Sequence, residues 1–483
     1  MTFVSELEPR PLWRHFDEIL TIPRGSGNEE GMRRYVRAVA EKSGLAVRAD
    51  GAGNLVVAKP GSAGRDGGPA TILQSHLDMV NEKNSDVSHD FDRDPIQPVQ
   101  DGAFLKASGT TLGSDNGIGV AAMLAVAEDH TLSHGPLELL FTIDEERGLS
   151  GASNLDAGLL TGTRLLNLDS EEEGTLTVGC AGGADSRLAL ALMSTAPAAG
   201  SAALSIRLAG LKGGHSGVDI HLQRGNALKL LGRALFAARM VVPATVASFR
   251  GGDKTNAIPR EAKATVLVAA GELGRFRTAL EGELGNLREE FKPAEPGLAW
   301  EIAEVAVPAS CWTPESSAKA LALVNALPHG VLQMSYDIPG LVETSTNLAR
   351  VLDDDGTLAI AMSNRSSVAS ALQATRQRNR AIAELAGASV AEGAGYPGWK
   401  PNLGSGLLAV MQRTHEAVLG FAPHVGAIHA GLECGIIGEK KPGMDMISFG
   451  PTIQFPHSPD ERVEIDTVGR FYRLLTATLM ELA

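Results

Sequence analysis

The chain has 483 residues, of which 43% are hydrophobic, and a formal net charge of -14. This length is enough to bury a sizeable core and favours about two or three domains. The acidic balance argues against nucleic acid and anionic membrane as partners, since both would be repelled.

Cysteine usage and the N-terminus bear on the compartment. Cys180, Cys311 and Cys434 are odd in number and far apart, so a disulfide framework is not expected. The N-terminal segment has no apolar stretch of the kind a signal peptide needs. No run of about eighteen apolar residues predicts a membrane span. We therefore expect a reduced, soluble, cytoplasmic protein.

The first part of the chain alternates helix and strand patterns. Ser26 and Glu29 have the spacing of a capping box, and apolar residues then recur at helical spacing until Gly44. A further helix is expected at 117–128. Short apolar runs predict strands at 54–58, 71–73, 137–143 and 165–168. This order indicates an α/β sheet with both faces covered.

The pattern changes after Gly183. Residues of about 200–307 read strand, helix, strand, strand, helix, strand, which is the βαββαβ order of a ferredoxin-like unit. Residues of about 315–393 are expected to repeat this unit, with Thr255-Asn256 and Thr346-Asn347 in similar places before a strand.

The α/β pattern resumes from Tyr396, with helices expected at 407–419 and 468–482. We interpret the chain as one catalytic domain in two segments, 1–183 and 395–483. An inserted α+β lid domain, 184–394, would separate them and would hold the doubled ferredoxin-like unit.

Five short segments place histidine and acidic side chains at the ends of predicted strands or in loops. They contain His76 and Asp78, Asp115, Glu145 and Glu146, Asp169, and His457. Zinc readily accepts imidazole nitrogen and carboxylate oxygen, so this set could hold one or two metal ions. Each residue also has an ordinary alternative, such as a helix N-cap for Asp115 or an exposed loop position for His457.

Spacing suggests how neighbouring residues divide their work. His76 and Asp78 are two apart on a strand and share a face, so one can bind metal while the other orients it. Of the adjacent acids Glu145 and Glu146, one can bind metal and the other can take a proton from water.

Together these motifs resemble the M20-type zinc exopeptidases, and among them the bacterial aminoacyl-histidine (Xaa-His) dipeptidases. The resemblance covers nearly the whole chain. It includes QSHLDMVNEKN, ASGTTLGSDNGIG, FTIDEERGLSGA, NLDSEEEG, VGCAGG, LKGGHSGVDIHLQRGNA, FRGGDKTNAIPREA, GYPGWKPN, IHAGLECG and SFGPTIQFPHSPDERV.

This resemblance implies a zinc-exopeptidase-like catalytic domain with a mixed sheet, and two Zn²⁺ ions per chain for which Co²⁺ or Mn²⁺ could substitute. His76 and Asp169 would hold one zinc, Glu146 and His457 the other, and Asp115 would bridge them.

The resemblance also implies roles around the metals. Asp78 would orient His76, Glu145 would be the general base, and His215 in the lid would stabilise the scissile carbonyl or its oxyanion. The expected substrate-binding residues are Asn256, Arg365 and Glu433.

The expected function is hydrolysis of dipeptides, in particular Xaa-His dipeptides such as β-alanyl-histidine, by a zinc-activated water. Two alternatives stay open: a broader aminopeptidase or deacylase with the same metal centre, and a non-catalytic binding protein. A homodimer is also open, although a doubled lid favours activity assembled within one chain.

Overall fold

The computed structural model describes residues 2–483, and the chain divides into two compact units. Unit 1 comprises Met1–Cys180, Trp399–Ala427 and Leu432–Ala483. Unit 2 comprises Ala181–Gly398 and Ile428–Gly431. Among the described residues, no helix combines the length and apolar character needed to cross a bilayer.

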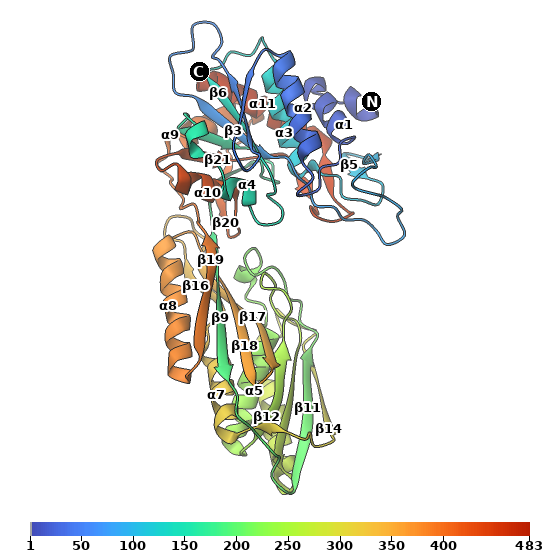
Figure 1. Cartoon of the computed structure of the whole chain (residues 1–483), viewed down its shortest axis with the longest axis vertical. Coiled ribbons are helices and arrows are strands. Elements are labelled where there is room, and N and C mark those ends of the chain that lie inside the picture. The colour runs from blue at the N-terminus through green and yellow to red at the C-terminus, as the bar shows by residue number, and fades with distance from the viewer. Residues whose placement is uncertain (1) are drawn as a thin grey trace. The chain divides into compact units, whose positions relative to one another are not determined.

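Unit 1 is built around an eight-stranded mixed sheet, seen in the upper part of Figure 1. In spatial order the strands are β1 (Ala46–Ala49), β2 (Leu55–Lys59), β6 (Leu137–Thr142), β3 (Thr71–His76), β7 (Arg164–Asn167), β21 (Asp445–Ser448), β8 (Thr175–Cys180) and β20 (His424–Ile428). The neighbours β6, β3, β7 and β21 run parallel. All residues of β3 and β6 are buried, as expected for parallel strands covered on both faces. The prediction of an α/β fold with a mixed sheet is confirmed.

The helices of unit 1 surround this sheet. Helix α3 (Ser114–Glu128) packs on β3 and is buried at every position from 116 to 127, as an internal helix requires. The helices α1 (Arg10–Ile19), α2 (Glu30–Lys42) and α11 (Ile465–Glu481) pack against α3. Helix α9 (Gly406–Leu419) lies on β21, and α10 (Glu433–Lys440) contacts β8 and α4 (Ser150–Ser153).

Short elements complete unit 1. A four-stranded sheet has the order β22 (Ile453–Gln454), β23 (Arg462–Glu464), β5 (Phe104–Ala107) and β4 (Pro98–Asp101). Two 3₁₀ turns are η1 (Phe3–Glu6) and η2 (Ala157–Leu159).

The capping box predicted at Ser26 and Glu29 is wrong. Helix α2 begins at Glu30, and neither side chain caps it. The Ser26 hydroxyl donates to Asp78 Oδ2 at 2.7 Å. Glu29 Oε1 accepts the backbone N–H groups of Gly27 and Asp144. The two side chains that local spacing assigned to a helix cap therefore form hydrogen bonds outside the helix instead.

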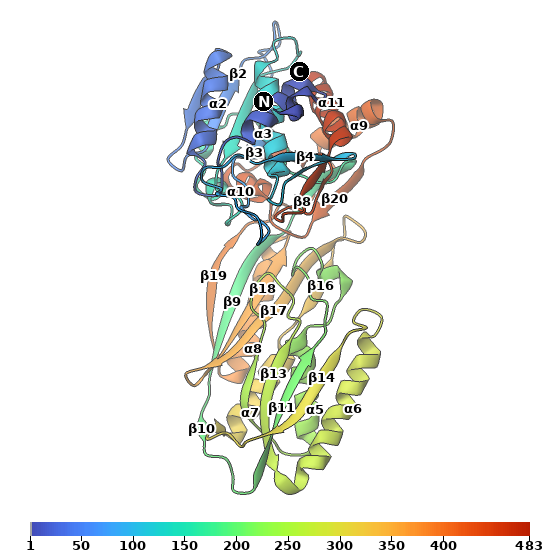
Figure 2. The same ribbon diagram turned by 90° about the vertical axis from the view of Figure 1, so that its right-hand side faces the viewer.

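Unit 2 contains a nine-stranded sheet in which every pairing is antiparallel (Figure 2). Its order is β14 (Ala299–Val305), β11 (Ser201–Ala209), β13 (Ala262–Ala269), β12 (Thr245–Gly251), β17 (Val342–Asp354), β18 (Thr357–Ser366), β9 (Gly182–Ala191) and β19 (Ser389–Tyr396), with β16 (Gly330–Met334) paired to β17. Strands β10 (Ser194–Thr195) and β15 (Cys311–Trp312) form a separate pair.

The nine-stranded sheet joins two ferredoxin-like units. The first is β11, α5 (Ala227–Val241), β12, β13, α6 (Leu273–Phe291) and β14. The second is β9, α7 (Pro314–Ala326), β17, β18, α8 (Ala369–Ala386) and β19. The strands of the two units join into one sheet where β12 pairs with β17. Two further 3₁₀ turns are η3 (Ile220–Leu222) and η4 (Ala270–Glu272).

Two details of the predicted repeat are wrong. The first strand of the second unit is β9, which precedes the first unit in the chain, so the first unit is inserted into the second. Thr346 and Asn347 lie inside β17, whereas Thr255 and Asn256 lie in the turn between β12 and β13. The first point depends on the pairing of β9 with β18, between residues 166 to 184 positions apart, which local pattern does not report.

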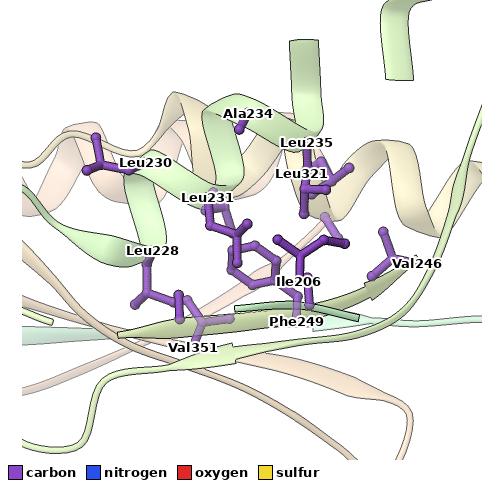
Figure 3. Packing of buried hydrophobic residues seen from close by; sticks show 14 of the residues in the cluster. Ile206, Leu228, Leu230, Leu231, Ala234, Leu235, Val246, Phe249, Leu321 and Val351 are labelled. Atoms are coloured by element: carbon purple, nitrogen blue, oxygen red, sulfur yellow. The ribbon is translucent and has the colours of Figure 1, made fainter. Parts of the chain in front are cut away.

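One hydrophobic core lies between the sheet of unit 2 and all four helices, α5 to α8. Figure 3 shows Phe249 of β12 and Val351 of β17 beneath Leu228 and Leu231 of α5, with Leu321 of α7 beside them. Each such side chain, when fully buried, contributes about 2 kcal/mol. Because residues of both ferredoxin-like units share this core, unit 2 is a single packed body.

Candidate metal centre

Three of the predicted site segments lie at one edge of the sheet of unit 1. His76 is the last residue of β3, Glu145 and Glu146 follow the end of β6, and Asp169 follows the end of β7. These strands are parallel neighbours in the order β6, β3, β7. Their carboxyl ends therefore meet, which is where open α/β sheets commonly bind ligands.

Asp115 lies between the two predicted histidine ligands. Its Oδ1 is 3.0 Å from His76 Nε2, and its Oδ2 is 3.2 Å from His457 Nε2. Its extended backbone, φ -82° and ψ 112°, is compatible with an N-cap, but both carboxylate oxygens are directed at imidazole nitrogens rather than at backbone N–H groups of α3. The N-cap alternative is therefore excluded, and the carboxylate occupies a bridging position.

Each imidazole has a second carboxylate beside it. Asp169 Oδ1 lies 3.2 Å from His76 Nε2, and Glu146 Oε2 lies 2.9 Å from His457 Nε2. Asp169 Oδ1 and Glu146 Oε1 are buried and have no hydrogen-bond partner within the described chain. The side chains of His76, Asp169 and Glu146 are at most 6% exposed, whereas that of His457 is 51% exposed. The centre is thus deep on one side and open to solvent on the other.

The donor set fits two cations that share Asp115. Bonds of about 2.0–2.2 Å in tetrahedral geometry place neighbouring ligand atoms roughly 3.3–3.6 Å apart, close to the spacing in the centre. The observed nitrogen–oxygen distances are 2.9–3.2 Å. Two groups, His76 with Asp115 and Asp169, and Asp115 with Glu146 and His457, bring one donor atom per residue within 4.8 Å of the others. Mixed imidazole and carboxylate donors suit zinc.

Asp78 supports the centre from behind. Its Oδ1 lies 3.4 Å from His76 Nδ1, and its backbone oxygen lies 3.2 Å from the same atom. Its carboxylate also accepts the backbone N–H groups of Glu145 at 3.0 Å and Glu146 at 3.2 Å. A group on the far nitrogen of a ligating histidine fixes the tautomer and the ring direction.

The electrostatics show that the centre favours positive charge. Hydrogen bonds to Asp115 and Glu146 raise the pKa of His457 to about 11. Burial opposes protonation of His76, but the carboxylates of Asp169, Asp115 and Asp78 raise its pKa well above the ordinary value. Burial raises the pKa of Asp169 to about 6. A divalent cation bound here would compete with the imidazole protons.

The pKa values of the remaining carboxyl groups are shifted in opposite directions by their surroundings. Burial works against ionisation of Asp78 and Asp115, yet hydrogen bonds from the neighbouring imidazoles lower the pKa of both. Burial, with the charges of nearby carboxylates including Asp169, raises the pKa of Glu145 well above its ordinary range. A carboxylate oxygen of Glu145 lies within 4.8 Å of donor atoms of His76 and Glu146. This position and the raised pKa are compatible with a general base, and that role of Glu145 stays a prediction.

Burial also affects Glu171, which sequence reasoning missed. With the carboxylates of Asp115 and Asp169 nearby, burial raises the pKa of Glu171 to about 9. The only signal in the sequence is its position two residues after Asp169.

A buried polar network under the centre was also missed. Gln74 of β3 donates to Thr142 of β6 at 3.2 Å and accepts from Asn167 of β7 at 2.6 Å. Both Gln74 and Thr142 donate to Glu433 Oε2, at 2.5 and 2.7 Å. The signal that could have found this network is the polar residue within each apolar strand.

Glu433, predicted to bind substrate, is fully buried at the start of α10. Burial raises its pKa to about 7. Its Oε1 has no hydrogen-bond partner among residues 2–483. A role in substrate binding stays a prediction.

Unit 2 brings together the other three predicted residues, His215, Asn256 and Arg365. His215 Nδ1 accepts the backbone N–H groups of residues 217 and 218, so its proton is on Nε2. The Ser216 N–H donates to the Asn256 backbone oxygen at 2.8 Å, which ties the two loops together. Burial and the charge of Arg365 lower the pKa of His215. Both observations favour the neutral imidazole with its proton on Nε2.

Arg365 is 8% exposed and donates to the Tyr396 hydroxyl at 2.9 Å. Its Nε is buried without a hydrogen-bond partner within the described residues. A buried guanidinium with an unused donor can recognise a carboxylate.

Comparison with known proteins identifies the family of this chain. The model of peptidase family M20/M25/M40 matches residues 72–481. A cytosol non-specific dipeptidase from Escherichia coli (strain K12) is 42% identical over 482 residues, which is 100% of this chain and 99% of that protein. The chain belongs to peptidase family M20/M25/M40. The predictions of an M20-type peptidase and of a hydrolase acting on peptide bonds are confirmed.

Two solved structures agree with this chain in fold. The aminoacylhistidine dipeptidase from Vibrio alginolyticus has a TM-score of 0.93 and 42% identity, covering 99% of this chain and 98% of that one. The aminopeptidase PepT from Bacillus cereus ATCC 10987 has a TM-score of 0.57 and 17% identity, with 99% of each chain covered, and shows the fold alone.

Proposed function

We propose that this M20 peptidase hydrolyses dipeptides at a centre of two Zn²⁺ ions, with Co²⁺ or Mn²⁺ able to substitute. The observation that carries the proposal is the position of Asp115, which offers one carboxylate oxygen to each of two histidines. Two full-length relatives with dipeptidase names support the substrate class.

The residues of the centre have distinct roles in this proposal. Bound cations supply positive charge that lowers the pKa of a water and polarises the scissile carbonyl. Glu145 takes the proton of the attacking water and gives it to the leaving amine. His76 is held by Asp78, so its Nε2 stays directed at Asp115 and Asp169.

Unit 2 supplies the proposed substrate contacts. Arg365 binds the C-terminal carboxylate, and His215 donates from Nε2 to the oxygen of the scissile carbonyl. Loss of one such donor typically costs about 3–4 kcal/mol of barrier lowering. Asn256 holds the substrate backbone. In unit 1, Glu433 lies near the substrate's amino end.

The finer substrate preference is also a proposal. We infer that Xaa-His dipeptides such as β-alanyl-histidine are good substrates, supported by the name of the Vibrio alginolyticus relative. We infer a cytoplasmic location from the name of the Escherichia coli relative. The net charge of -14 supports a protein without nucleic-acid or membrane partners.

Metal analysis combined with a substrate panel tests the proposal. The panel contains β-alanyl-histidine, alanyl-histidine, alanyl-leucine, a tripeptide and an N-acetyl amino acid. We expect two zinc ions per chain and turnover of the dipeptides, with the highest kcat/KM for Xaa-His. Faster cleavage of the tripeptide or the N-acetyl amino acid would instead indicate the broader aminopeptidase or the deacylase. Metal binding without any hydrolysis would indicate a binding protein.

A further inference from the structure

Glu461 binds the backbone of the segment that carries Asp115. Its Oε2 accepts the N–H groups of Leu112 at 2.9 Å and Gly113 at 3.0 Å. Its Oε1 accepts the N–H of Ser114 at 2.7 Å and the Ser114 hydroxyl at 2.6 Å. Glu461 is 2% exposed, so these bonds replace nearly all of its hydration. The carboxylate therefore fixes the three residues that precede Asp115.

Arg24 binds the same segment through its carbonyl side. One guanidinium nitrogen donates to the Gly113 oxygen, and the other donates to the oxygens of Leu77 at 3.1 Å and Asp78 at 2.7 Å. Arg24 is 3% exposed. It thus connects the segment before Asp115 with the residues that follow His76.

The buried charges of Arg24 and Glu461 stabilise each other. A buried ion is costly unless it is paired and hydrogen-bonded, and the opposite charge of Glu461 favours the charged form of Arg24. Gly113 has φ +72°, and a side chain there would collide with the Arg24 guanidinium. The segment is therefore shaped to lie against Arg24 while its amides face Glu461.

We propose that Arg24 and Glu461 are positioning residues, which hold the segment 112–115 so that both carboxylate oxygens of Asp115 face the ligating histidines. This inference rests on the proposed two-cation function. Neither residue touches a donor atom of the centre in our proposal; both act through the backbone. Glu461 also lies four residues after His457, so it links the segments of two ligands.

Glu138 provides a matched control in the same unit. It is 4% exposed, and its carboxylate accepts the N–H groups of Thr161 and Gly162 and the Thr161 hydroxyl. It lies near the start of β6, whereas Glu145 follows the end of that strand. Glu138→Gln therefore damages a similar backbone contact at the end of β6 that is remote from the centre, together with an ion pair to Arg48 at 3.5 Å.

The test compares Glu461→Gln with Glu138→Gln in the full chain. Zn²⁺ affinity is measured by competition with a chromophoric chelator, thermal unfolding is measured on chelator-treated protein, and kcat and KM are measured at saturating Zn²⁺. We expect Glu461→Gln to weaken Zn²⁺ binding about 10–100-fold, the usual effect of losing a group that orients metal ligands. Its kcat should fall more than its KM rises, and Glu138→Gln should keep the affinity of the parent.

Two milder variants keep the inference testable if Glu461→Gln does not fold. Ser114→Ala removes one hydroxyl donor to Glu461, and Arg24→Lys keeps the charge but loses the fork that reaches both segments. Both should weaken Zn²⁺ binding. Unchanged affinity in both, or equal losses in the Glu461 and Glu138 variants, would overturn the inference. A parent chain that binds no Zn²⁺ would overturn the proposed function as well.

Discussion

The carboxylate of Asp78 accepts the backbone N–H of Glu145 at 3.0 Å. The residue that orients His76 therefore also fixes the segment of the predicted general base. We expect Asp78→Asn to lower both Zn²⁺ affinity and kcat, by about 10–100-fold, because the amide turns a donor toward groups that need an acceptor. Ser26→Ala removes only the hydroxyl bond to Asp78 and is the milder comparison. Steady-state kinetics and metal titration measure both. Parent-like kinetics in Asp78→Asn would contradict this role.

Replacement of Glu145 and replacement of Glu146 are expected to impair different functions of the centre. Glu145→Gln should retain metal but lose most turnover, since the amide is nearly isosteric yet cannot accept the proton. Glu146→Gln should lose metal, since Glu146 Oε2 lies beside His457 Nε2. Metal content by elemental analysis and kcat at saturating Zn²⁺ separate the two. Metal loss in the Glu145 variant alone would mean that the roles are reversed.

Arg365 is expected to recognise the free carboxylate of the substrate. Arg365→Ala should raise KM for dipeptides by roughly 10–100-fold, the worth of a hydrogen bond to a charged group. The effect should be much smaller for the same dipeptides with an amidated C-terminus. Comparison of the two substrate forms in parent and variant is the measurement. Equal losses for both forms would show that Arg365 does not read the carboxylate.

Buried histidines of unit 2 predict acid sensitivity. Burial lowers the pKa of His329 and of His429 to about 3 each. Between pH 6.5 and 3 the unfolded chain binds protons that the folded chain does not, so stability falls as pH falls, by at most about 1.4 kcal/mol per pH unit for each group. Urea unfolding of chelator-treated protein across this range measures the slope. His329→Gln should flatten it; an unchanged slope would exclude His329 as a source.

The nine-stranded sheet of unit 2 bears on how the active site is completed. Because one chain supplies two ferredoxin-like units, we predict that His215 acts within its own chain. The test mixes His215→Ala chains with Glu145→Gln chains, each inactive alone. We expect no recovery of activity, whether or not the chain forms a homodimer. Activity on mixing would show that His215 acts on the neighbouring subunit.

Several site residues, most helices and the family could be predicted from the amino-acid sequence alone. His76, Asp169 and the Glu145–Glu146 pair could be predicted as site residues because each follows or ends an apolar run. A strand buried in a parallel sheet places polar, reactive side chains only near its carboxyl end. Helical periodicity located helices such as α5 and α6 with small errors at their ends. The ordered motifs, which run over nearly the whole chain, predicted the family that the comparison then confirmed.

Tertiary structure decided what depends on contacts between distant residues. Only the fold shows that Asp115 bridges two histidines rather than capping α3, and that Ser26 bonds Asp78 rather than α2. It also reveals that β9 begins the second ferredoxin-like unit. Arg24 and Glu461 both hydrogen-bond the backbone of the segment 112–115, which only the fold shows. Local propensity reports interactions within a few residues, whereas these bonds join segments 39 to 349 residues apart. Their formation depends on packing of the whole unit, which no local pattern encodes.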